Sequence, residues 1–177
     1  PFVRLPGREE PVAAKVIAKD EQMDIALLQV ADPAVKELEP LPISTDRVGR
    51  GKSIAVFGYP LGDAVGMGLK LTIGNVSALA EEATEGMDLL DCTVKPGNSG
   101  GPLCDKAGRV IGLVTAKSRT DYNVDSYGMA RPANHLLDFL KKNLPSYQPV
   151  AASDAEQGWD QVDAQVSDSV LMIVMKE

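Results

Sequence analysis

The sequence predicts an all-β domain, a barrel or a sandwich, followed by a terminal helix. Short apolar stretches recur along most of the 177 residues and are separated by turns rich in Gly, Pro, Asp and Glu. A helical period begins only after Pro132, where Leu136, Leu137, Leu140 and Leu144 fall on one face. Many short strands followed by one helix are typical of an all-β fold.

Three strands are expected in the first 30 residues. Residues 2–5 alternate in polarity, residues 12–18 are β-branched and apolar, and residues 24–30 form an apolar run that begins with Asp24. Polar turns separate these stretches, which favours antiparallel neighbours. Further strands are expected at 41–44, 52–57, 69–79, 87–94, 109–116 and 126–130.

Composition excludes several classes of function. The net charge of −7 and the pI of about 4.8 oppose binding to nucleic acid or to an anionic membrane surface. No apolar run reaches the roughly 20 residues that span a bilayer, and residues 1–6 lack the pattern of a signal peptide. Two cysteines and one histidine cannot assemble a typical zinc site, so we expect no metal and no cofactor.

Cys92 and Cys104 lie on either side of a loop rich in glycine. A disulfide and two buried free thiols are both compatible with the sequence. The loop, residues 95–102, contains too much Gly and Pro for a helix or a regular strand. Such a loop can aim backbone N–H groups into the space beside the Ser99 hydroxyl, as in an oxyanion hole. An ordinary surface turn remains the alternative, because a short motif is only a hypothesis.

Four motifs in a fixed order decide between these alternatives. They are Asp-Ile-Ala-Leu-Leu at 24–28, Gly-Tyr-Pro-Leu-Gly at 58–62, Thr-Ile-Gly-Asn-Val-Ser at 72–77 and Gly-Asn-Ser-Gly-Gly-Pro at 97–102. Over roughly residues 2–144 the chain resembles the HtrA (Deg) family of trypsin-like serine proteases. The resemblance implies two antiparallel β-barrels with the active site in the cleft between them.

The resemblance also implies the roles of individual residues. Ser99 corresponds to the nucleophile, and Asp24 corresponds to the acid that orients the general base. The backbone N–H groups of Gly97 and Ser99 would form the oxyanion hole, with Asn98 between them. A polypeptide is the expected substrate.

The walls of the first substrate pocket are expected to include Thr93, Val94, Thr115 and Ala116. These positions lie just before the serine loop and along the strand that follows it. None of the four is acidic, so the pocket should favour an apolar side chain over Lys or Arg.

One part of the family pattern is missing. The family has its residues in the order His, Asp, Ser, and the motif Thr-Asn-Ala-His would fall before Pro1. His135 lies on the expected terminal helix and is interpreted as a surface or boundary residue. Loss of such a histidine costs on the order of a millionfold in turnover, so residues 1–177 alone are expected to be inactive. The alternative is a protease-like module that binds a peptide or partner without catalysis.

The expected organisation has four parts. Residues 1–45 form a partial N-terminal barrel, 46–145 form the C-terminal barrel and its helix, and 146–158 form a linker. Residues 159–177 resemble the opening helix and strand of a second protease-like domain. An incomplete barrel has an open edge that recruits another strand, so the tail strand should pack there, in its own chain or in a neighbour's. A homo-oligomer or strand exchange could follow. The resemblance favours an extracytoplasmic location, periplasmic or secreted, without fixing the compartment.

Overall fold

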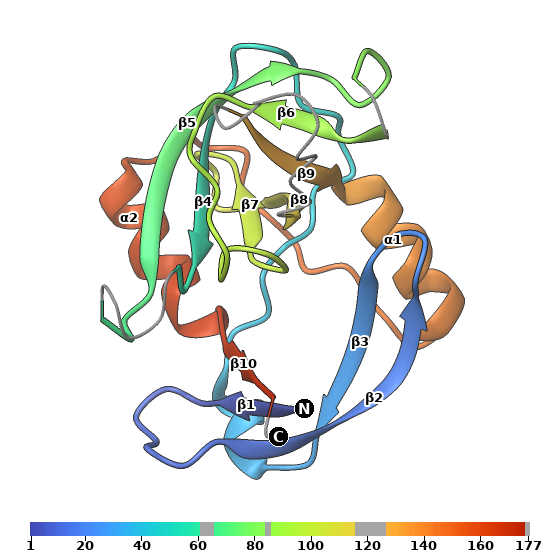
Figure 1. Ribbon diagram of the computed structural model, residues 1–177, viewed down its shortest axis with the longest axis vertical. Helices are drawn as coiled ribbons and strands as arrows, with labels where there is room; N and C mark the ends of the chain where they lie inside the picture. The colour runs from blue at the N-terminus through green and yellow to red at the C-terminus, as the bar shows by residue number, and fades with distance from the viewer. Residues whose placement is uncertain (61–65, 84–85, 116–126, 176–177) are drawn as a thin grey trace.

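The computed structural model describes residues 1–60, 66–83, 86–115 and 127–175. Within these residues the chain forms a closed six-stranded barrel and an open four-stranded sheet. The barrel occupies the upper part of Figure 1 and the open sheet the lower part. Two α-helices and short 3-10 turns complete the described fold.

The barrel has antiparallel neighbours throughout. Its order is β4 (Ser53–Gly58), β5 (Lys70–Ala78), β6 (Asp88–Leu90), β9 (Gly128–Pro132), β8 (Val110–Thr115) and β7 (Pro102–Cys104), and β7 pairs with β4 to close it. Because successive side chains of a strand point to opposite faces, Ile54 and Val56 join one buried cluster while Ala55 and Phe57 join another. The second cluster includes Val162 of the tail helix, so β4 is covered on both faces.

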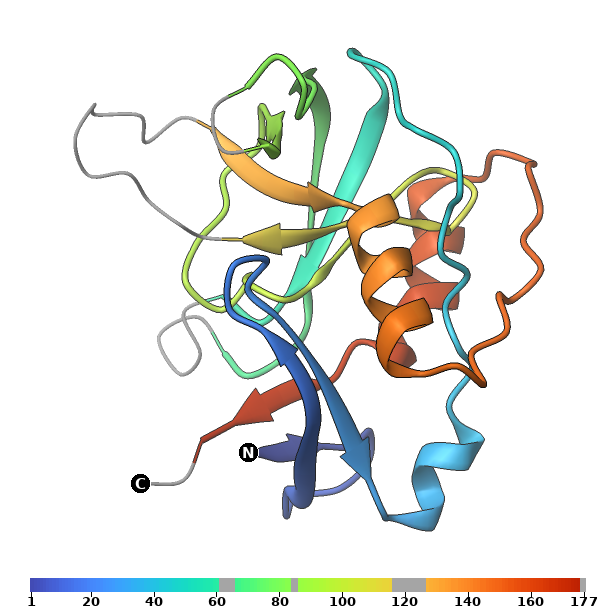
Figure 2. The ribbon, with the colours of Figure 1, turned by 90° about the vertical axis from the view of Figure 1, so that its right-hand side faces the viewer.

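Residues 1–45, expected as a partial N-terminal barrel, contribute three strands to an open sheet, and their assignment as a partial barrel stays a prediction. The order of this sheet is β10 (Met172–Val174), β1 (Phe2–Arg4), β2 (Val12–Asp20) and β3 (Ile25–Val30), all antiparallel. Four strands in this order do not close, and β10 and β3 form its two edges. The tail strand does occupy the edge of β1, in its own chain, and the two strands run side by side in Figures 1 and 2.

Two helices pack on the barrel. The expected helix after Pro132 is α1 (Ala133–Asn143), which buries Leu137, Phe139 and Leu140. In the tail, α2 (Trp159–Val166) continues into the 3-10 turn η4 (Ser167–Ser169). In α2 the side chains of Val162 and Val166 are 0% exposed, which shows that the tail is part of the packed structure.

Two expected strands are shorter than predicted. The segment 41–44 contributes only one bridge, between Ile43 and Val110, because its proline lacks the N–H that a longer ladder needs. Strand β6 ends at Leu90, and the next residue, Asp91, instead accepts hydrogen bonds from the backbone and side chain of Asn75. The connection after β3 contains the 3-10 turn η1 (Pro33–Glu37).

Both cysteines are free thiols. Cys92 and Cys104 are buried in different clusters of the barrel, which resolves the question that the sequence left open. Burial raises the pKa of each thiol, and the nearby carboxylates of Asp91 and Asp105 raise them further. Unpaired thiols of this kind behave as small apolar side chains.

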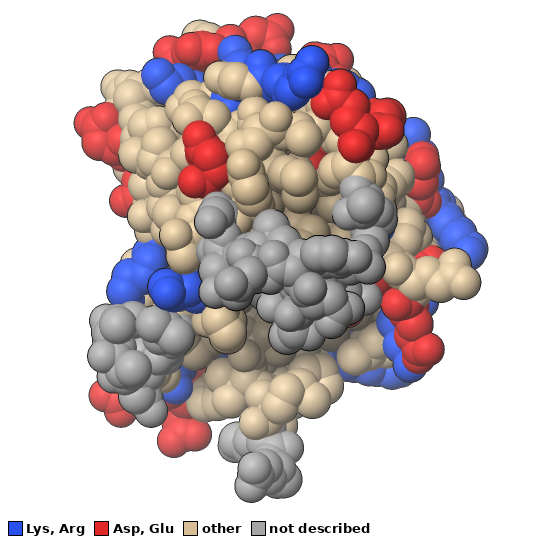
Figure 3. Space-filling view, turned by 45° about the horizontal axis from the view of Figure 1, so that its top comes forward, with Lys and Arg blue, Asp and Glu red and all other residues tan. Residues whose placement is uncertain are grey.

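The surface carries both charges. Acidic and basic side chains are interspersed over the face shown in Figure 3. None of the described helices has the length and apolar character needed to cross a membrane. The described residues likewise contain no group of three or more His, Cys, Asp or Glu placed to hold a metal ion.

Candidate active site

The serine loop is held in place by hydrogen bonds at both of its sides. Within the loop, the Asn98 N–H donates to the Lys95 carbonyl (2.9 Å) and the Gly101 N–H donates to the Asn98 carbonyl (3.0 Å). The Gly100 N–H donates to the Val114 carbonyl of β8 (2.8 Å). The loop is therefore fixed to the barrel rather than projecting from it.

Three glycines in the loop are required by its geometry. Gly97 and Gly100 have φ angles of +99° and +80°, which side chains disfavour. Moreover, a Cβ atom at Gly97 would collide with the Tyr59 carbonyl, and one at Gly101 would collide with the Phe57 carbonyl. The glycine pattern thus allows the loop to lie directly on the end of β4.

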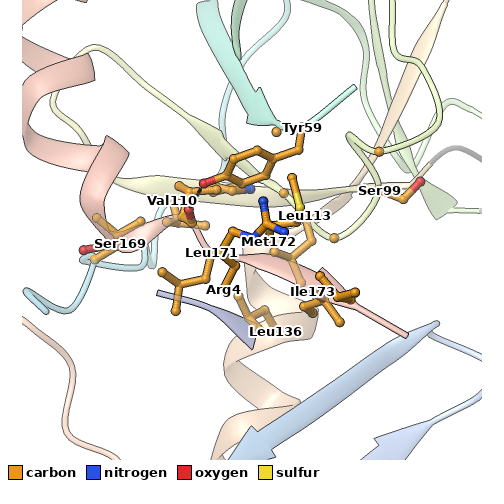
Figure 4. Close-up of a pocket in the computed structure, with 18 of the residues that line it drawn as sticks. Arg4, Tyr59, Ser99, Val110, Leu113, Leu136, Ser169, Leu171, Met172 and Ile173 are labelled. Carbon is orange, nitrogen blue, oxygen red and sulfur yellow. Dashed lines mark hydrogen bonds between the residues drawn. The ribbon is translucent and has the colours of Figure 1, made fainter. Parts of the chain in front are cut away.

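Ser99 is exposed at the edge of a cavity. Figure 4 shows its side chain at one end of this space. The neighbouring Asn98 is only 3% exposed, and its backbone N–H is already used by Lys95. The groups expected to form the oxyanion hole, the N–H groups of Gly97 and Ser99, belong to the same loop, and their role stays a prediction.

Asp24 lies on a different part of the molecule. It is exposed in the turn between β2 and β3 and has a φ of +54°, a left-handed conformation that Asp tolerates better than most residues. Asp24 forms no hydrogen bond or ion pair with any other described residue. Ser99 belongs to the barrel and Asp24 to the open sheet. A general base that contacts both residues would therefore have to lie between the barrel and the sheet. The role of Asp24 stays a prediction.

His135 lies on α1 and is half-buried. Its Nδ1 atom is shielded from solvent and has no hydrogen-bond partner in the described structure. The pKa of Glu81 is lowered by a hydrogen bond from its own backbone, then by Arg47, and to a smaller extent by His135. The half-buried position of His135 agrees with its interpretation as a boundary residue.

The residues expected to line the first substrate pocket differ in their exposure to solvent. Thr93 is exposed, Val94 is half-buried and Thr115 is buried, while Ala116 lies outside the described residues. The sequence analysis missed Gly128, where a Cβ atom would overlap the Val94 side chain. A glycine at the start of an apolar strand is the signal that could have indicated this close approach.

Comparison with known proteins now identifies the family. Residues 3–113 match the trypsin-like peptidase domain, which is more than half of the chain. The chain belongs to the trypsin-like peptidase family. Within that family its relatives are of the HtrA/Deg type, as the four motifs predicted.

Named relatives support this assignment. The chain is 30% identical to the serine protease Do-like HtrA of Bacillus subtilis over 145 residues, which is 77% of this chain and 32% of that protein. It is 35% identical to the periplasmic pH-dependent serine endoprotease DegQ of Escherichia coli over 153 residues, 78% of this chain and 32% of DegQ. The active form of a Mycobacterium tuberculosis protease superposes with a TM-score of 0.62 and 26% identity, covering 81% of this chain and 63% of that one.

The match is partial with respect to the relatives. The chain spans between 18% and 33% of the length of the first curated relatives that it matches. It therefore corresponds to part of a protease of this family. The fold class is trypsin-like and mostly β, with one closed barrel and one open sheet.

Tyr59 connects the tail to the serine loop, a role that sequence reasoning did not find. Its N–H donates to the Gly97 carbonyl (3.1 Å), and its hydroxyl donates to the Val170 carbonyl (2.7 Å). Burial raises the pKa of Tyr59, so the hydroxyl remains a donor. No local pattern pairs residue 59 with residue 170, because the contact depends on where the tail packs.

Proposed function

We propose that this chain is the part of an HtrA-type serine endopeptidase that supplies the nucleophile, the oxyanion hole and the acid of the catalytic triad. Ser99 is the nucleophile, and Asp24 is the acid. The observation that carries the proposal is the exposed Ser99 on a loop whose glycines are clamped against β4. Its substrate is a polypeptide, as the family of the relatives implies.

The chemistry of the loop follows from its hydrogen bonds. Ser99 Oγ attacks the carbonyl carbon of a peptide bond, and the negative charge that develops on the carbonyl oxygen needs preorganised donors. The Asn98 N–H donates to the Lys95 carbonyl. By the resemblance to the family, the N–H groups of Gly97 and Ser99 are the proposed donors. These donors cost no reorganisation, because the loop is already fixed to β4 and β8.

The general base comes from outside residues 1–177 in this proposal. A serine hydroxyl is a poor nucleophile until a base takes its proton, and the single histidine of the chain, His135, lies on α1. The base would stand between Asp24 and Ser99 and be oriented by Asp24. The pocket near Thr93, Val94, Thr115 and Ala116 would take an apolar side chain, since none of these residues is acidic.

A fluorophosphonate probe tests the proposal, because it labels activated serines. We expect slow labelling of residues 1–177, and rapid labelling when the histidine-bearing segment of an HtrA relative is fused ahead of Pro1. The Ser99→Ala variant of the fused chain should not react. Rapid labelling of residues 1–177 would contradict the missing base, and an inert fused chain with an intact fold would contradict the role of Ser99.

A binding module without catalysis is the second candidate. It is favoured by Asp24, which has no hydrogen-bond partner among the described residues. The same labelling experiment distinguishes the candidates. A fused chain that binds peptide but never labels supports the binding module.

Strand exchange is a separate proposal about assembly. Strand β10 pairs with β1 of its own chain through Phe2↔Val174 and Arg4↔Met172. The same pairing between two copies would give a domain-swapped oligomer, with 159–177 as the exchanged segment. Light scattering during gel filtration measures the mass, and a monomer at all concentrations would contradict the exchange.

A further inference from the structure

The cavity beside Ser99 contains one charged side chain among the described residues that line it. The cavity has a volume of about 710 Å³, within the size range of ligand pockets. Its charged residue is Arg4, and no Asp or Glu is among the described lining residues. Most of the remaining wall is apolar and includes Leu41, Ile43, Val110, Leu113 and Leu136.

Strand alternation directs Arg4 into this space. Its neighbours Val3 and Leu5 are each 3% exposed, and adjacent residues of a strand point to opposite faces. Arg4 is the cross-strand partner of Met172 of β10, so the two residues lie side by side on the same face of the sheet. Figure 4 shows its guanidinium directed toward Tyr59, with Ser99 at the other end of the cavity.

Arg4 differs from the arginines that pair with acids in this protein. Arg8 contacts Asp32 (2.6 Å) and Arg109 contacts Asp105 (2.8 Å). In contrast, Arg4 forms no ion pair with a described residue, and its Nε atom is buried without a hydrogen-bond partner. A cation among apolar groups is costly unless an anion pairs with it. Among the described lining residues, no carboxylate stands opposite Arg4 to pair with it.

We infer that this cavity binds a polypeptide segment in which a carboxylate is flanked by apolar side chains, with Arg4 as the ion partner. The inference rests on the proposed function and adds a substrate class to it. A guanidinium pairs with a carboxylate through two parallel hydrogen bonds, which gives both strength and orientation. The whole chain carries a net charge of −7 and does not attract anions in general. A preference for a carboxylate would therefore come from Arg4 itself.

The carboxylate has two sources within a polypeptide, an acidic side chain or a free C-terminus. In either case it would lie on the side of Ser99 toward the open sheet. This position is separate from the pocket expected at Thr93 and Val94, since neither of these residues lines the cavity.

Fluorescence polarisation with residues 1–177 tests the inference without catalysis. The probes are labelled apolar pentapeptides with a central Glu, with a central Gln, and with the Gln and a free C-terminal carboxylate; the first two have a capped C-terminus. We expect the Glu probe to bind about tenfold more tightly than the capped Gln probe, as for one charged hydrogen-bonded pair. The third probe shows whether a C-terminal carboxylate also binds.

The Arg4→Met variant should abolish this preference and leave binding of the capped Gln probe unchanged. Lys15→Met, which removes an exposed cation elsewhere on the sheet, should keep it. If Arg4→Met fails to fold, two other measurements replace it. They are the preference of the Arg4→Lys variant for the Glu probe over the capped Gln probe, and the loss of this preference at high salt. Equal binding of the Glu and Gln probes, a preference that survives Arg4→Met, or loss of binding in the histidine-bearing fused chain would each overturn the inference. Fluorophosphonate labelling of the fused chain is independent of these outcomes, so the proposed function can fail or hold separately.

Discussion

Strand β4 of the closed barrel and strands β2 and β10 of the open sheet bury their large apolar residues to very different extents. In the barrel strand β4, Ile54 and Phe57 are both 0% exposed. In the open sheet, Ile17 of β2 is 44% exposed and Ile173 of β10 is 56% exposed. All four are large apolar residues in strands, so strand character alone does not determine burial. What differs is the cover: β4 lies in a closed barrel and is flanked by α2, whereas β10 is an edge strand of the sheet and Ile17 and Ile173 face solvent.

The two proposed catalytic residues lie on opposite sides of this comparison, one on the barrel and one on the open sheet. Ser99 and its loop are fixed to the barrel through Val114 and Tyr59, so their geometry depends on the best-packed part of the molecule. Asp24 is in the β2–β3 turn of the open sheet and forms no hydrogen bond with the described residues. The nucleophile is therefore preorganised, while the acid depends on the less covered sheet.

The largest expected effect comes from the barrel core. Phe57→Ala removes a fully buried aromatic ring that packs with Val162 of α2, and should lower the free energy of unfolding by about 3–5 kcal/mol. Urea denaturation at pH 7 measures the loss. A loss below about 1 kcal/mol would mean that the barrel is no better packed than the sheet.

The pH dependence of the free energy of unfolding above neutral pH is the next test, because both cysteines are buried in the barrel. The unfolded thiols ionise near pH 8.5, whereas burial raises the pKa of the folded Cys104 thiol, so the unfolded state releases protons first. Stability should therefore fall as the pH rises above about 8.5, by about 1.4 kcal/mol per pH unit for a fully buried thiol. Urea denaturation between pH 7 and 10, with a reductant present, measures the slope.

The Cys104→Ala variant is the control for this slope. It removes one buried thiol, so stability should depend less steeply on pH between 8.5 and 10 even though the variant is less stable at pH 7. An unchanged slope would show that Cys104 ionises normally in the folded barrel.

Removal of β10 should affect the sheet alone. A chain that ends at Leu171 keeps the Val170 carbonyl bonded to Tyr59 but leaves β1 without a neighbour on one side. Backbone amides of β1 should exchange hydrogen about tenfold faster, a local loss of roughly 1.4 kcal/mol, with barrel amides unchanged. A chain that ends at Met175 retains β10 and should behave as the full chain. Faster exchange throughout the barrel would show that the two parts unfold together.

The smallest effect is expected on the open face of the sheet. Ile17→Ala should change the free energy of unfolding by no more than about 0.5 kcal/mol, because the side chain is 44% exposed. It is measured beside Phe57→Ala under the same conditions. A loss as large as that of Phe57→Ala would indicate that another surface covers β2 in solution.

Several features were predictable because they depend on neighbours in the chain. Alternating or continuous apolar runs identified β2, β4, β5 and β8, and the leucines after Pro132 identified α1. The glycines of the serine loop were predictable for the same reason, since Gly97 needs a positive φ. Local patterns overestimated segment 41–44, where Pro42 lacks the N–H that a longer ladder needs.

The sequence by itself therefore determined the strands, the terminal helix, the family and the serine loop. Only the tertiary structure decided that β10 pairs with β1 in the same chain, that Tyr59 joins the tail to Gly97, and that Arg4 faces a cavity with no acid among its described lining residues. The physical reason is that periodicity and turn chemistry act over a few residues. Burial and pairing depend instead on which distant segments meet, and that is a property of the whole packed chain.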